Sequence, residues 1–290
     1  MRNSLVCAVV ISYNPSLDVL KNIQLSLNQV AHVVVVDNTP QANVSSVLND
    51  LEKLDACTVI RNHKNLGIAT ALNIGIRYAI SKGFPWIMTL DQDSWMRDGY
   101  VEEMFSTYQD AVHGIVGMLC PRYEDAGMGS AFSTLRSANG DVVVCITSGS
   151  MIQADTFSLI GPMEDDFFID SVDHEYCLRM RAAGLKVIEC PRAILVHSLG
   201  RITEHKFLGR TFSTNNHSAK RRYYITRNRL VLMKRYFYKD REWVIADLKR
   251  MVYDAVRIFL AEQDKFSKAR YIVRAIWDAI FDRLGQRVPL

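Results

Sequence analysis

The sequence lacks the features that mark several classes of protein. Its six cysteines form no CxxC pair, and several lie in apolar runs where a free thiol behaves as a small apolar side chain. A reducing compartment is therefore the simplest setting. No uninterrupted apolar stretch approaches the roughly 20 residues that span a bilayer, so we expect any membrane contact to be peripheral. No small-residue cleavage site follows the apolar run of residues 5–11, which we do not expect to be a signal peptide.

The common phosphate-binding loops are absent as well. No GxGxxG pattern follows the first predicted strand, and no GxxxxGK[ST] pattern occurs anywhere in the sequence. These absences argue against a dinucleotide-binding site and against a P-loop. The sequence also has no internal repeat and no low-complexity segment. Side chains outside these loops must hold the phosphates of any phosphorylated ligand.

The chain does contain enough apolar sequence for a large core. Of its 290 residues, 49% are apolar and 23% are charged, which excludes disordered, collagenous and disulfide-scaffold proteins. Charge is unevenly distributed, because residues 1–200 hold 14 basic and 22 acidic side chains, whereas residues 201–290 hold 21 and 9. We therefore expect an acidic body over residues 1–205 and a basic helical region over residues 206–290.

The body has the pattern of alternating strands and helices. Continuous runs rich in β-branched residues are typical of strands covered on both faces in a parallel sheet. Such runs occupy residues 5–11, 33–36, 57–60 and 86–90. After the first run, Asn14 is expected to cap a helix whose first residue is Pro15. The order predicts an α/β fold with a mostly parallel sheet flanked by helices.

Polar residues follow the predicted strands, and the pair Asp91 and Asp93 stands out among them. In open α/β sheets, ligands bind beyond the carboxyl ends of the strands. Both carboxylates project from one face if the chain stays extended. Two close carboxylates are costly without a cation, and Mg²⁺ or Mn²⁺ with phosphate oxygens as further ligands would offset that cost. The alternative is an Asp-rich turn that caps the next helix.

A second group of candidates lies downstream. Asp170 and Asp173 are three residues apart, so in a helix they share a face, and one carboxylate could act as a general base toward a hydroxyl. The alternative is an acidic first turn that complements the helix dipole. His197 ends a later predicted strand, where a histidine is either a structural hydrogen-bonding group or a metal ligand.

Seven short motifs, taken in order, resemble the family 2 glycosyltransferases of GT-A fold over about residues 5–200. They are Val10-Ile11-Ser12-Tyr13-Asn14, Val36-Asp37-Asn38, Asn65-Leu66-Gly67, Leu90-Asp91-Gln92-Asp93, Ser148-Gly149-Ser150, Phe168-Ile169-Asp170-Ser171-Val172-Asp173 and Val196-His197. The DQDS and FIDxVDxE forms, with Tyr223-Tyr224 and Arg227-Asn228 further on, look most like bacterial rhamnosyltransferases of surface polysaccharide and O-antigen assembly. The resemblance implies a nucleotide-diphospho-sugar transferase-like fold.

On the donor side, the resemblance implies a nucleotide-sugar site at the strand ends. Its residues would be Ser12, Tyr13 and Asn14 along the base, Asp37 hydrogen-bonded to the base, and Asn65 and Gly67 around the nucleotide pocket. Asp91 would meet the ribose or the metal, and Asp93 and His197 would bind the divalent cation. The implied donor is dTDP-L-rhamnose, with a UDP- or GDP-sugar as the alternative.

On the acceptor side, the resemblance implies that Ser148, Gly149 and Ser150 lie beside the sugar and the acceptor. Asp173 matches the family's base, although Val172 stands where the family has Glu, which leaves Asp170 and Glu175 as candidates for a supporting role. The implied reaction is a single inverting displacement. Processive synthases of this family carry a QxxRW sequence after the base, and none occurs here, so the resemblance implies transfer of one sugar or a few.

The basic region has the pattern of amphipathic helices. An apolar stripe at helical spacing consists of Val244, Leu248, Val252, Ala255 and Phe259. We expect this stripe to pack on the body or on a second copy in a homodimer, and the charge excess of the region to favour an anionic membrane surface. The acceptor implied by the resemblance is a polyprenyl-diphosphate-linked glycan. The expected location is therefore the cytoplasm, at the cytoplasmic face of the inner membrane.

Two other functions stay open on the sequence alone. A sugar-nucleotide pyrophosphorylase would also be an α/β protein with acidic metal ligands, but it has a glycine-rich loop where this sequence has Ser12 to Pro15. A non-enzymatic RNA-binding or membrane scaffold would explain the basic region through phosphate contacts. It would leave the acidic strand ends unexplained, so we do not expect nucleic acid as a partner.

Overall fold

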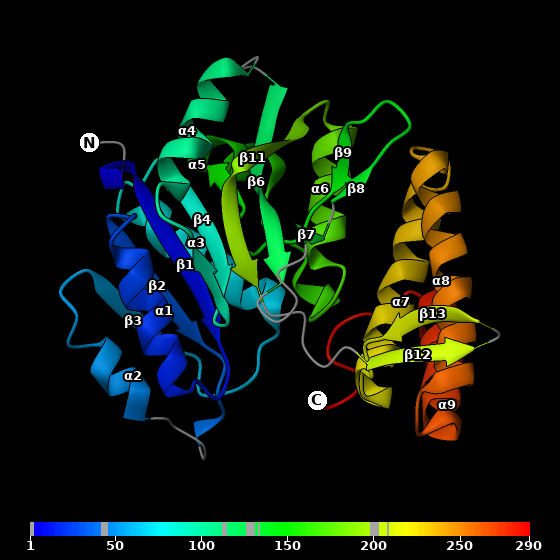
Figure 1. The fold of residues 1–290 in the computed structure, drawn as a ribbon. Coiled ribbons are helices and arrows are strands. Elements are labelled where there is room, and N and C mark those ends of the chain that lie inside the picture. Colours follow the sequence, from blue (N-terminus) through cyan, green and yellow to red (C-terminus); the bar gives the residue numbers. More distant parts are fainter. Residues whose placement is uncertain are drawn as a thin grey trace. The chain divides into compact units, whose positions relative to one another are not determined.

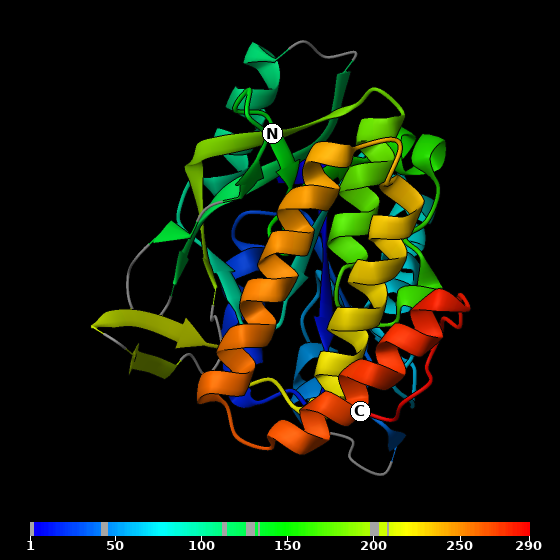
Figure 2. The ribbon, with the colours of Figure 1, turned by 90° about the vertical axis from the view of Figure 1, so that its right-hand side faces the viewer.

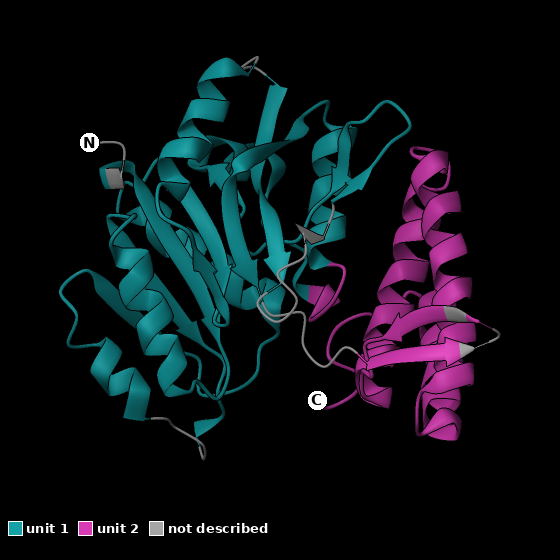
Figure 3. Ribbon diagram, in the orientation of Figure 1, with its two compact units in different colours: residues 1–165, 172–198 teal, residues 166–171, 199–290 magenta. Residues whose placement is uncertain are grey.

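The computed structural model describes residues 3–41, 46–111, 115–125, 131–132, 134–197, 203–207 and 209–290. The chain divides into two compact units (Figure 3). The first comprises residues 1–165 and 172–198, and the second comprises residues 166–171 and 199–290. The second unit thus contains the expected basic region and, in addition, a short segment that immediately precedes residue 172.

One sheet forms the centre of the first unit (Figure 1). Its strand order is β3-β2-β1-β4-β10-β6-β11-β9-β8, with β5 paired to β11 and β7 paired to β6. The parallel strands predicted from the sequence are β1 (Val6–Ser12), β2 (His32–Asp37), β3 (Cys57–Arg61) and β4 (Trp86–Asp91). Each pairs in parallel with its neighbour in the order β3-β2-β1-β4, so the α/β prediction is confirmed.

The other half of the sheet is mixed. Its strands are β5 (Ser94–Met96), β6 (Val116–Asp125), β7 (Ala131–Phe132), β8 (Leu135–Arg136), β9 (Val142–Val144), β10 (Met151–Gln153) and β11 (Lys186–His197). The strand predicted to end at His197 is β11, which continues through Pro191 with an irregularity between Cys190 and Ile194. β11 runs parallel to β6 and antiparallel to the short β5.

Helices cover both faces of this sheet. They are α1 (Leu17–Leu27), α2 (Ser46–Leu51), α3 (Ile68–Ser81), α4 (Tyr100–Asp110), α5 (Ala154–Ile160) and α6 (Val172–Ala182), with short 3₁₀ turns at Asn3–Leu5 and Asp165–Phe167. Val6, Ala8 and Val10 belong to one core cluster with residues of α1, α2 and α4. Val9 faces α3, where a Cβ added at Gly75 would lie 2.3 Å from its Cγ1. Burial on both faces explains why β1 is apolar throughout.

The first helix begins later than predicted. α1 starts at Leu17, and Ser16 is its N-cap residue, so the expected start at Asn14 and Pro15 is wrong. Asn14 instead adopts a left-handed backbone with φ 48°, a conformation that Asn tolerates better than most residues. Its backbone N–H donates to Thr39 Oγ1 at 2.8 Å. The turn after β1 is therefore shaped by a contact with the end of β2.

The described part of the second unit contains three long helices and a hairpin. They are α7 (Ala219–Tyr236), α8 (Arg241–Ala261), α9 (Lys265–Ile280), β12 (Thr203–Phe207) and β13 (Arg210–Thr214). α7 packs against both α8 and α9 (Figures 1 and 2). The predicted helical character is confirmed, whereas the hairpin was not predicted. Among the residues described, no helix combines the length and apolar character needed to cross a membrane.

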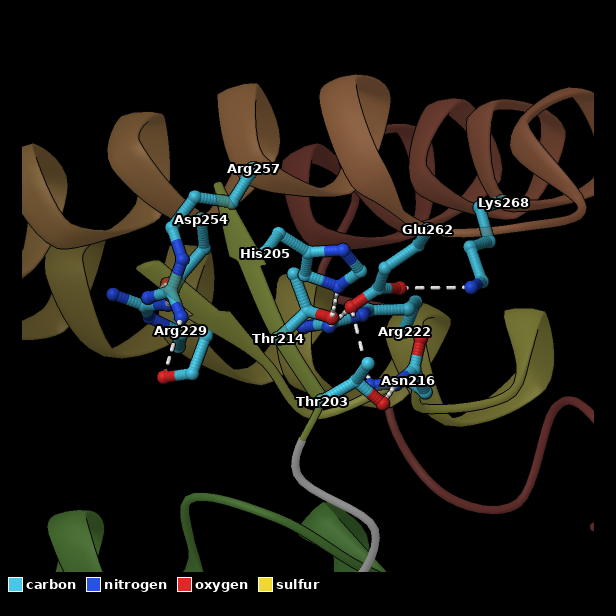
Figure 4. Close-up of polar contacts among 11 residues, drawn as sticks. Thr203, His205, Thr214, Asn216, Arg222, Arg229, Asp254, Arg257, Glu262 and Lys268 are labelled. Carbon is cyan, nitrogen blue, oxygen red and sulfur yellow. Dashed lines mark hydrogen bonds and ion pairs between the residues drawn. The ribbon is translucent and has the colours of Figure 1, made fainter. Parts of the chain in front are cut away.

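A buried network of ion pairs joins the helices of the second unit (Figure 4). The fully buried Glu262 carboxylate lies 2.7 Å from Arg222 of α7 and 2.7 Å from Lys268 of α9. Burial opposes ionisation of Glu262, but Lys268 and Arg222 outweigh it, and the pKa of this carboxyl lies below its ordinary value. Nearby, Arg229 of α7 pairs with Asp247 of α8 at 2.9 Å.

Candidate functional site

The ends of β4 and β11 bring together two carboxylates and an imidazole. Asp91 ends β4, Asp93 follows it, and His197 ends β11. The antiparallel pairing of β5 with β11 places His197 opposite Ser94, the residue after Asp93. One ligand atom from each of Asp91, Asp93 and His197 lies within 4.8 Å of the others. The structure thus brings His197 next to an acidic pair that lies about a hundred residues earlier in the sequence.

Two buried serines orient this cluster. The Ser94 hydroxyl lies 2.7 Å from His197 Nδ1 and 2.9 Å from the Ser148 hydroxyl. Ser148 Oγ in turn accepts a hydrogen bond from the Asp91 backbone N–H at 3.0 Å. Metal-binding histidines commonly use their second ring nitrogen for such a partner. The sequence gives no local indication of this role for Ser94, although Ser94 directly follows the acidic pair.

The donor set fits a hard or borderline divalent cation. Carboxylate oxygens suit Mg²⁺ and Mn²⁺, and an imidazole nitrogen is compatible with the second of these. Asp93 is about half exposed, with 53% of its side-chain surface accessible, whereas His197 is mostly buried at 15%. A cation held here would thus contact both the protein interior and a ligand in solvent.

The candidate base-binding residues at the ends of β1 and β2 bond one another. Ser12 Oγ donates to Asp37 Oδ1 at 2.6 Å, and Thr39 donates to the same carboxylate through Oγ1 at 2.8 Å and through its N–H at 3.1 Å. Ser12 and Asp37 are buried at 1% and 2% exposure. This bonding fixes the Asp37 carboxylate at the strand ends, and its contact with a nucleotide stays a prediction.

Gln92, the residue between Asp91 and Asp93, links the cluster to the turn after β1. Its side-chain Oε1 accepts from the Tyr13 N–H at 2.9 Å, and its Nε2 donates to the Tyr13 carbonyl at 3.3 Å. Tyr13 itself is 40% exposed. The Gln92 side chain therefore connects the turn of Asp91 and Asp93 to the turn after β1. The sequence did not reveal this role of Gln92.

The Asn65 and Gly67 pair forms the turn that starts α3. Asn65 Oδ1 accepts from the Gly67 N–H at 3.0 Å, and Gly67 has a φ of 86°, a conformation suited to glycine. Asn38 Nδ2 donates to the Gly67 carbonyl at 3.0 Å, so this turn is held beside the end of β2. The two predicted pocket residues are thus ordered by the neighbouring strand end.

Ser148, Gly149 and Ser150 are buried beneath the cluster. Gly149 has a φ of 78°, and a Cβ there would lie 2.6 Å from the Tyr100 hydroxyl. Ser150 Oγ donates to the Ile146 carbonyl at 2.8 Å. In the structure this turn supports the cluster through Ser148, and its contact with an acceptor stays a prediction.

The three carboxylates near the start of α6 have different partners. α6 begins at Val172, so Asp170 lies outside the helix, and the expectation that Asp170 and Asp173 share a helical face is wrong. Asp170 adopts φ 63° and pairs with Arg221 at 3.1 Å. Glu175 is buried and pairs with Arg179 at 2.6 Å. Asp173 Oδ1 accepts from the His174 N–H at 2.8 Å, and none of the ion pairs among the described residues involves Asp173.

Comparison with known proteins identifies the family. Residues 7–160 match the model of the family described as Glycosyl transferase family 2. The chain belongs to this family. As a family 2 glycosyltransferase the protein is an enzyme. The alternative interpretations as a sugar-nucleotide pyrophosphorylase or as a non-enzymatic scaffold are therefore wrong. The sequence resemblance is thereby confirmed at the level of the family.

Two curated relatives match most of this glycosyltransferase. The dTDP-rhamnosyl transferase RfbF of Shigella flexneri is 30% identical over 288 residues, which cover 94% of each chain. The galactofuranosyltransferase GlfT1 of Mycolicibacterium smegmatis is 24% identical over 254 residues, or 79% of this chain and 82% of the relative. Both are similar over the two units rather than over the sheet alone.

Solved structures share the fold of this glycosyltransferase. A crystal structure of GalNAc-T7 with UDP, GalNAc and Mn²⁺ has a TM-score of 0.63 at 12% identity, and the match covers 97% of this chain and 57% of that one. The chain thus spans little more than half the length of GalNAc-T7 in that structure. S. aureus TarS 1-349 in complex with UDP-GlcNAc has a TM-score of 0.55 at 12% identity, over 98% and 76%. The GT-A fold class is therefore confirmed.

Proposed function

We propose that this enzyme transfers L-rhamnose from dTDP-L-rhamnose to a lipid-linked glycan acceptor in the synthesis of a cell-surface polysaccharide such as O-antigen. The observation that carries the proposal is the 30% identity to the dTDP-rhamnosyl transferase RfbF over 94% of both chains. The proposal is also supported by the cluster of Asp91, Asp93 and His197, whose side chains could hold the cation of a nucleotide-sugar donor. The alternative donor is a UDP- or GDP-sugar, because the fold also occurs with UDP-GlcNAc in TarS.

In this proposal the strand ends bind the donor. Ser12, Tyr13, Asn14 and Asp37 lie along the base, with Asn65 and Gly67 around the same pocket. Asp93 and His197 would hold Mg²⁺ or Mn²⁺, and Asp91 would meet the ribose or the metal. Ser94 orients the imidazole through Nδ1. A divalent cation bound there would neutralise the charge that grows on the leaving diphosphate.

Asp173 is the proposed general base. It removes the proton from the acceptor hydroxyl while that oxygen bonds to the anomeric carbon and the bond to the diphosphate breaks on the opposite face. The configuration at that carbon is thereby inverted. Asp170 and Glu175 are engaged by Arg221 and Arg179, which favours Asp173 among the three carboxylates. The turn of Ser148, Gly149 and Ser150 is the proposed acceptor side.

We further propose that the helical region attaches the enzyme to the cytoplasmic face of the inner membrane, where a polyprenyl-diphosphate-linked glycan would be reached. In the apolar stripe of α8, Val244 is buried, but Leu248, Val252 and Phe259 are 45%, 57% and 46% exposed. Further exposed apolar residues on α9 are Val273, Trp277 and Ile280. Exposed Lys249 and Arg250 beside the stripe suit anionic lipid.

A donor panel tests the proposed specificity. Thermal unfolding is followed with dTDP-L-rhamnose, dTDP-glucose, UDP-GlcNAc and a GDP-sugar, each with and without Mg²⁺ or Mn²⁺. A ligand at a hundredfold excess over its dissociation constant adds about 2.7 kcal/mol, which raises Tm by about 4–5 °C in a protein of this size. We expect a cation-dependent shift with dTDP-L-rhamnose. A shift with a UDP- or GDP-sugar alone would overturn the rhamnose assignment.

A further inference from the structure

Arg227 of α7 is a fully buried cation whose two terminal nitrogens donate hydrogen bonds to backbone carbonyls. It is 0% exposed, and its guanidinium stacks on the ring of Tyr224, 5.0 Å from the centroid. Nη1 donates to the Gly285 carbonyl at 2.6 Å, and Nη2 donates to the carbonyls of Phe167 and Asp166 at 3.2 and 3.3 Å. Burial of a guanidinium costs folding free energy unless hydrogen bonds compensate for the lost water. These bonds therefore hold the Arg227 side chain in one orientation.

Asn228, the next residue, holds the same segment. It is also 0% exposed. Its Nδ2 lies 3.0 Å from the Phe167 carbonyl, 2.8 Å from that of Ile169 and 2.7 Å from that of Asp170. Its Oδ1 accepts from Arg227 Nε at 2.9 Å, which fixes the orientation of the amide. The two side chains therefore act together on residues 166–171.

The segment that they hold has an unfavourable backbone. Phe168, Asp170 and Ser171 have φ values of 64°, 63° and 62°, in the left-handed region that favours glycine. Such residues persist only where their surroundings impose the conformation, and they often occur at functional sites. The Phe168 ring lies 5.2 Å from the ring of Tyr224, and Arg221 pairs with Asp170. Side chains of α7 thus supply the surroundings.

This segment leads directly into the helix that carries the proposed base. Ser171 is followed by Val172, the first residue of α6, and then by Asp173. We propose that Arg227 and Asn228 are positioning residues for sugar transfer, because they impose the backbone conformation from which α6 starts and so set the place of the Asp173 carboxylate. The inference rests on the proposed role of Asp173. Both residues act through the segment rather than on the reacting atoms.

The expected consequence is a loss of rate without a loss of donor binding. A misplacement of about 1 Å can cost about a hundredfold in rate, because proton transfer needs the base within hydrogen-bond reach. Lysine cannot reproduce the planar fork of the Arg227 guanidinium. We expect Arg227→Lys and Asn228→Ser to lower kcat about 10- to 100-fold, with the dissociation constant of dTDP-L-rhamnose unchanged.

Arg229→Lys is the matched control. Arg229 is a buried arginine of the same helix that pairs with Asp247 and Asp254 of α8 rather than with residues 166–171. All variants are assayed well below their measured unfolding temperatures, so that each is folded in the assay. The control is expected to lose stability and to keep the wild-type kcat. If it lost kcat as strongly as Arg227→Lys, the effect would be structural and the positioning role would be overturned.

Asn228→Ser keeps the proposal testable if Arg227→Lys does not fold. A wild-type kcat in this variant, with a normal fold, would contradict the inference. Asp173→Asn is measured in parallel. Full turnover by Asp173→Asn would overturn the base assignment itself, whereas an inactive Asp173→Asn beside a fully active Asn228→Ser would overturn the positioning role alone.

Discussion

At the scale of single residues, the acidic groups of the site differ in their surroundings. Glu175 and Asp170 are bound by arginines, and Asp93 is half exposed beside His197. Among the described residues, the Asp173 carboxylate accepts a hydrogen bond from the His174 N–H and joins no ion pair. Residues of one chemical type are thus separated into ion-pair partners, a candidate ligand and a candidate base. The predictions at this scale concern single side chains.

Asp93→Ala is expected to weaken donor binding in a cation-dependent way. Removal of one carboxylate from the cluster of Asp91, Asp93 and His197 lowers its affinity for a divalent cation. Calorimetric titration with dTDP-L-rhamnose, with and without Mg²⁺, measures the effect. Asp98→Ala, at an exposed aspartate five residues along, is the control. Equal donor affinities in wild type and Asp93→Ala with Mg²⁺ present would rule out Asp93 as a ligand.

Part of the site could be predicted from single residues and part could not. Asp91 and Asp93 were candidates because polar residues after buried strands belong to the ligand-binding edge of such a sheet, and the family resemblance added His197. The structure brings the three together. Ser94 and Gln92 were missed, since their roles arise from the pairing of β5 with β11 and from a contact with Tyr13. Neither interaction has a local signal in the sequence.

At the scale of elements, the strands were easier to predict than the turns. Continuous runs of β-branched residues identify β1 to β4, because a strand that is buried on both faces is apolar at every position. The start of α1 was predicted too early because Asn14 forms a turn that contacts Thr39. The start of α6 was also predicted too early, because contacts with α7, some 50 residues later in the sequence, hold Asp170 in a left-handed backbone conformation. Local propensity does not contain such long-range contacts.

Glu262→Gln tests the buried network between α7 and α9. The substitution leaves the mostly buried Arg222 and Lys268 without their shared carboxylate. Removal of one partner from a buried ion pair costs about 3–5 kcal/mol. The free energy of unfolding measured with urea should fall by this amount in Glu262→Gln. It should hardly change in Glu204→Gln, a substitution at an exposed residue. An equally stable Glu262→Gln would mean that the network contributes little net stability.

At the scale of the whole molecule, stability should depend on pH through His217. Burial, followed by the charges of Arg221 and Arg222, lowers the pKa of His217 to about 4, although Asp170 and Glu262 act in the opposite direction. In the unfolded chain His217 binds a proton at about pH 6.5. The contribution of neutral His217 to the free energy of unfolding is therefore full above about pH 6.5 and is lost as the pH falls toward about 4. Urea unfolding at about pH 7 and pH 5 should show wild type losing more stability than His217→Gln. Parallel losses in the two proteins would contradict this account.

Membrane attachment is also a property of the whole molecule. Most of the wild type should sediment together with vesicles of anionic phosphatidylglycerol. A smaller fraction of Val252→Glu should do so, because this substitution puts a charge in the exposed stripe of α8. Leu159→Glu, an equally drastic change at a 74% exposed residue of the first unit, is the control. Binding that is equal for all three proteins would exclude the stripe as the membrane surface, and a change in oligomeric state with Val252→Glu alone would assign the stripe to a homodimer.

The most direct test of the account measures sugar transfer itself. Wild type and Asp173→Asn are saturated with dTDP-L-rhamnose and Mg²⁺, supplied with a membrane lipid extract that carries polyprenyl-diphosphate-linked glycans, and followed by release of dTDP and by the anomeric configuration of the product. We predict an inverted rhamnosyl product from the wild type and a rate about 10²- to 10⁴-fold lower for Asp173→Asn with unchanged donor affinity. Transfer by Asp173→Asn at the wild-type rate, or a product of retained configuration, would contradict the account.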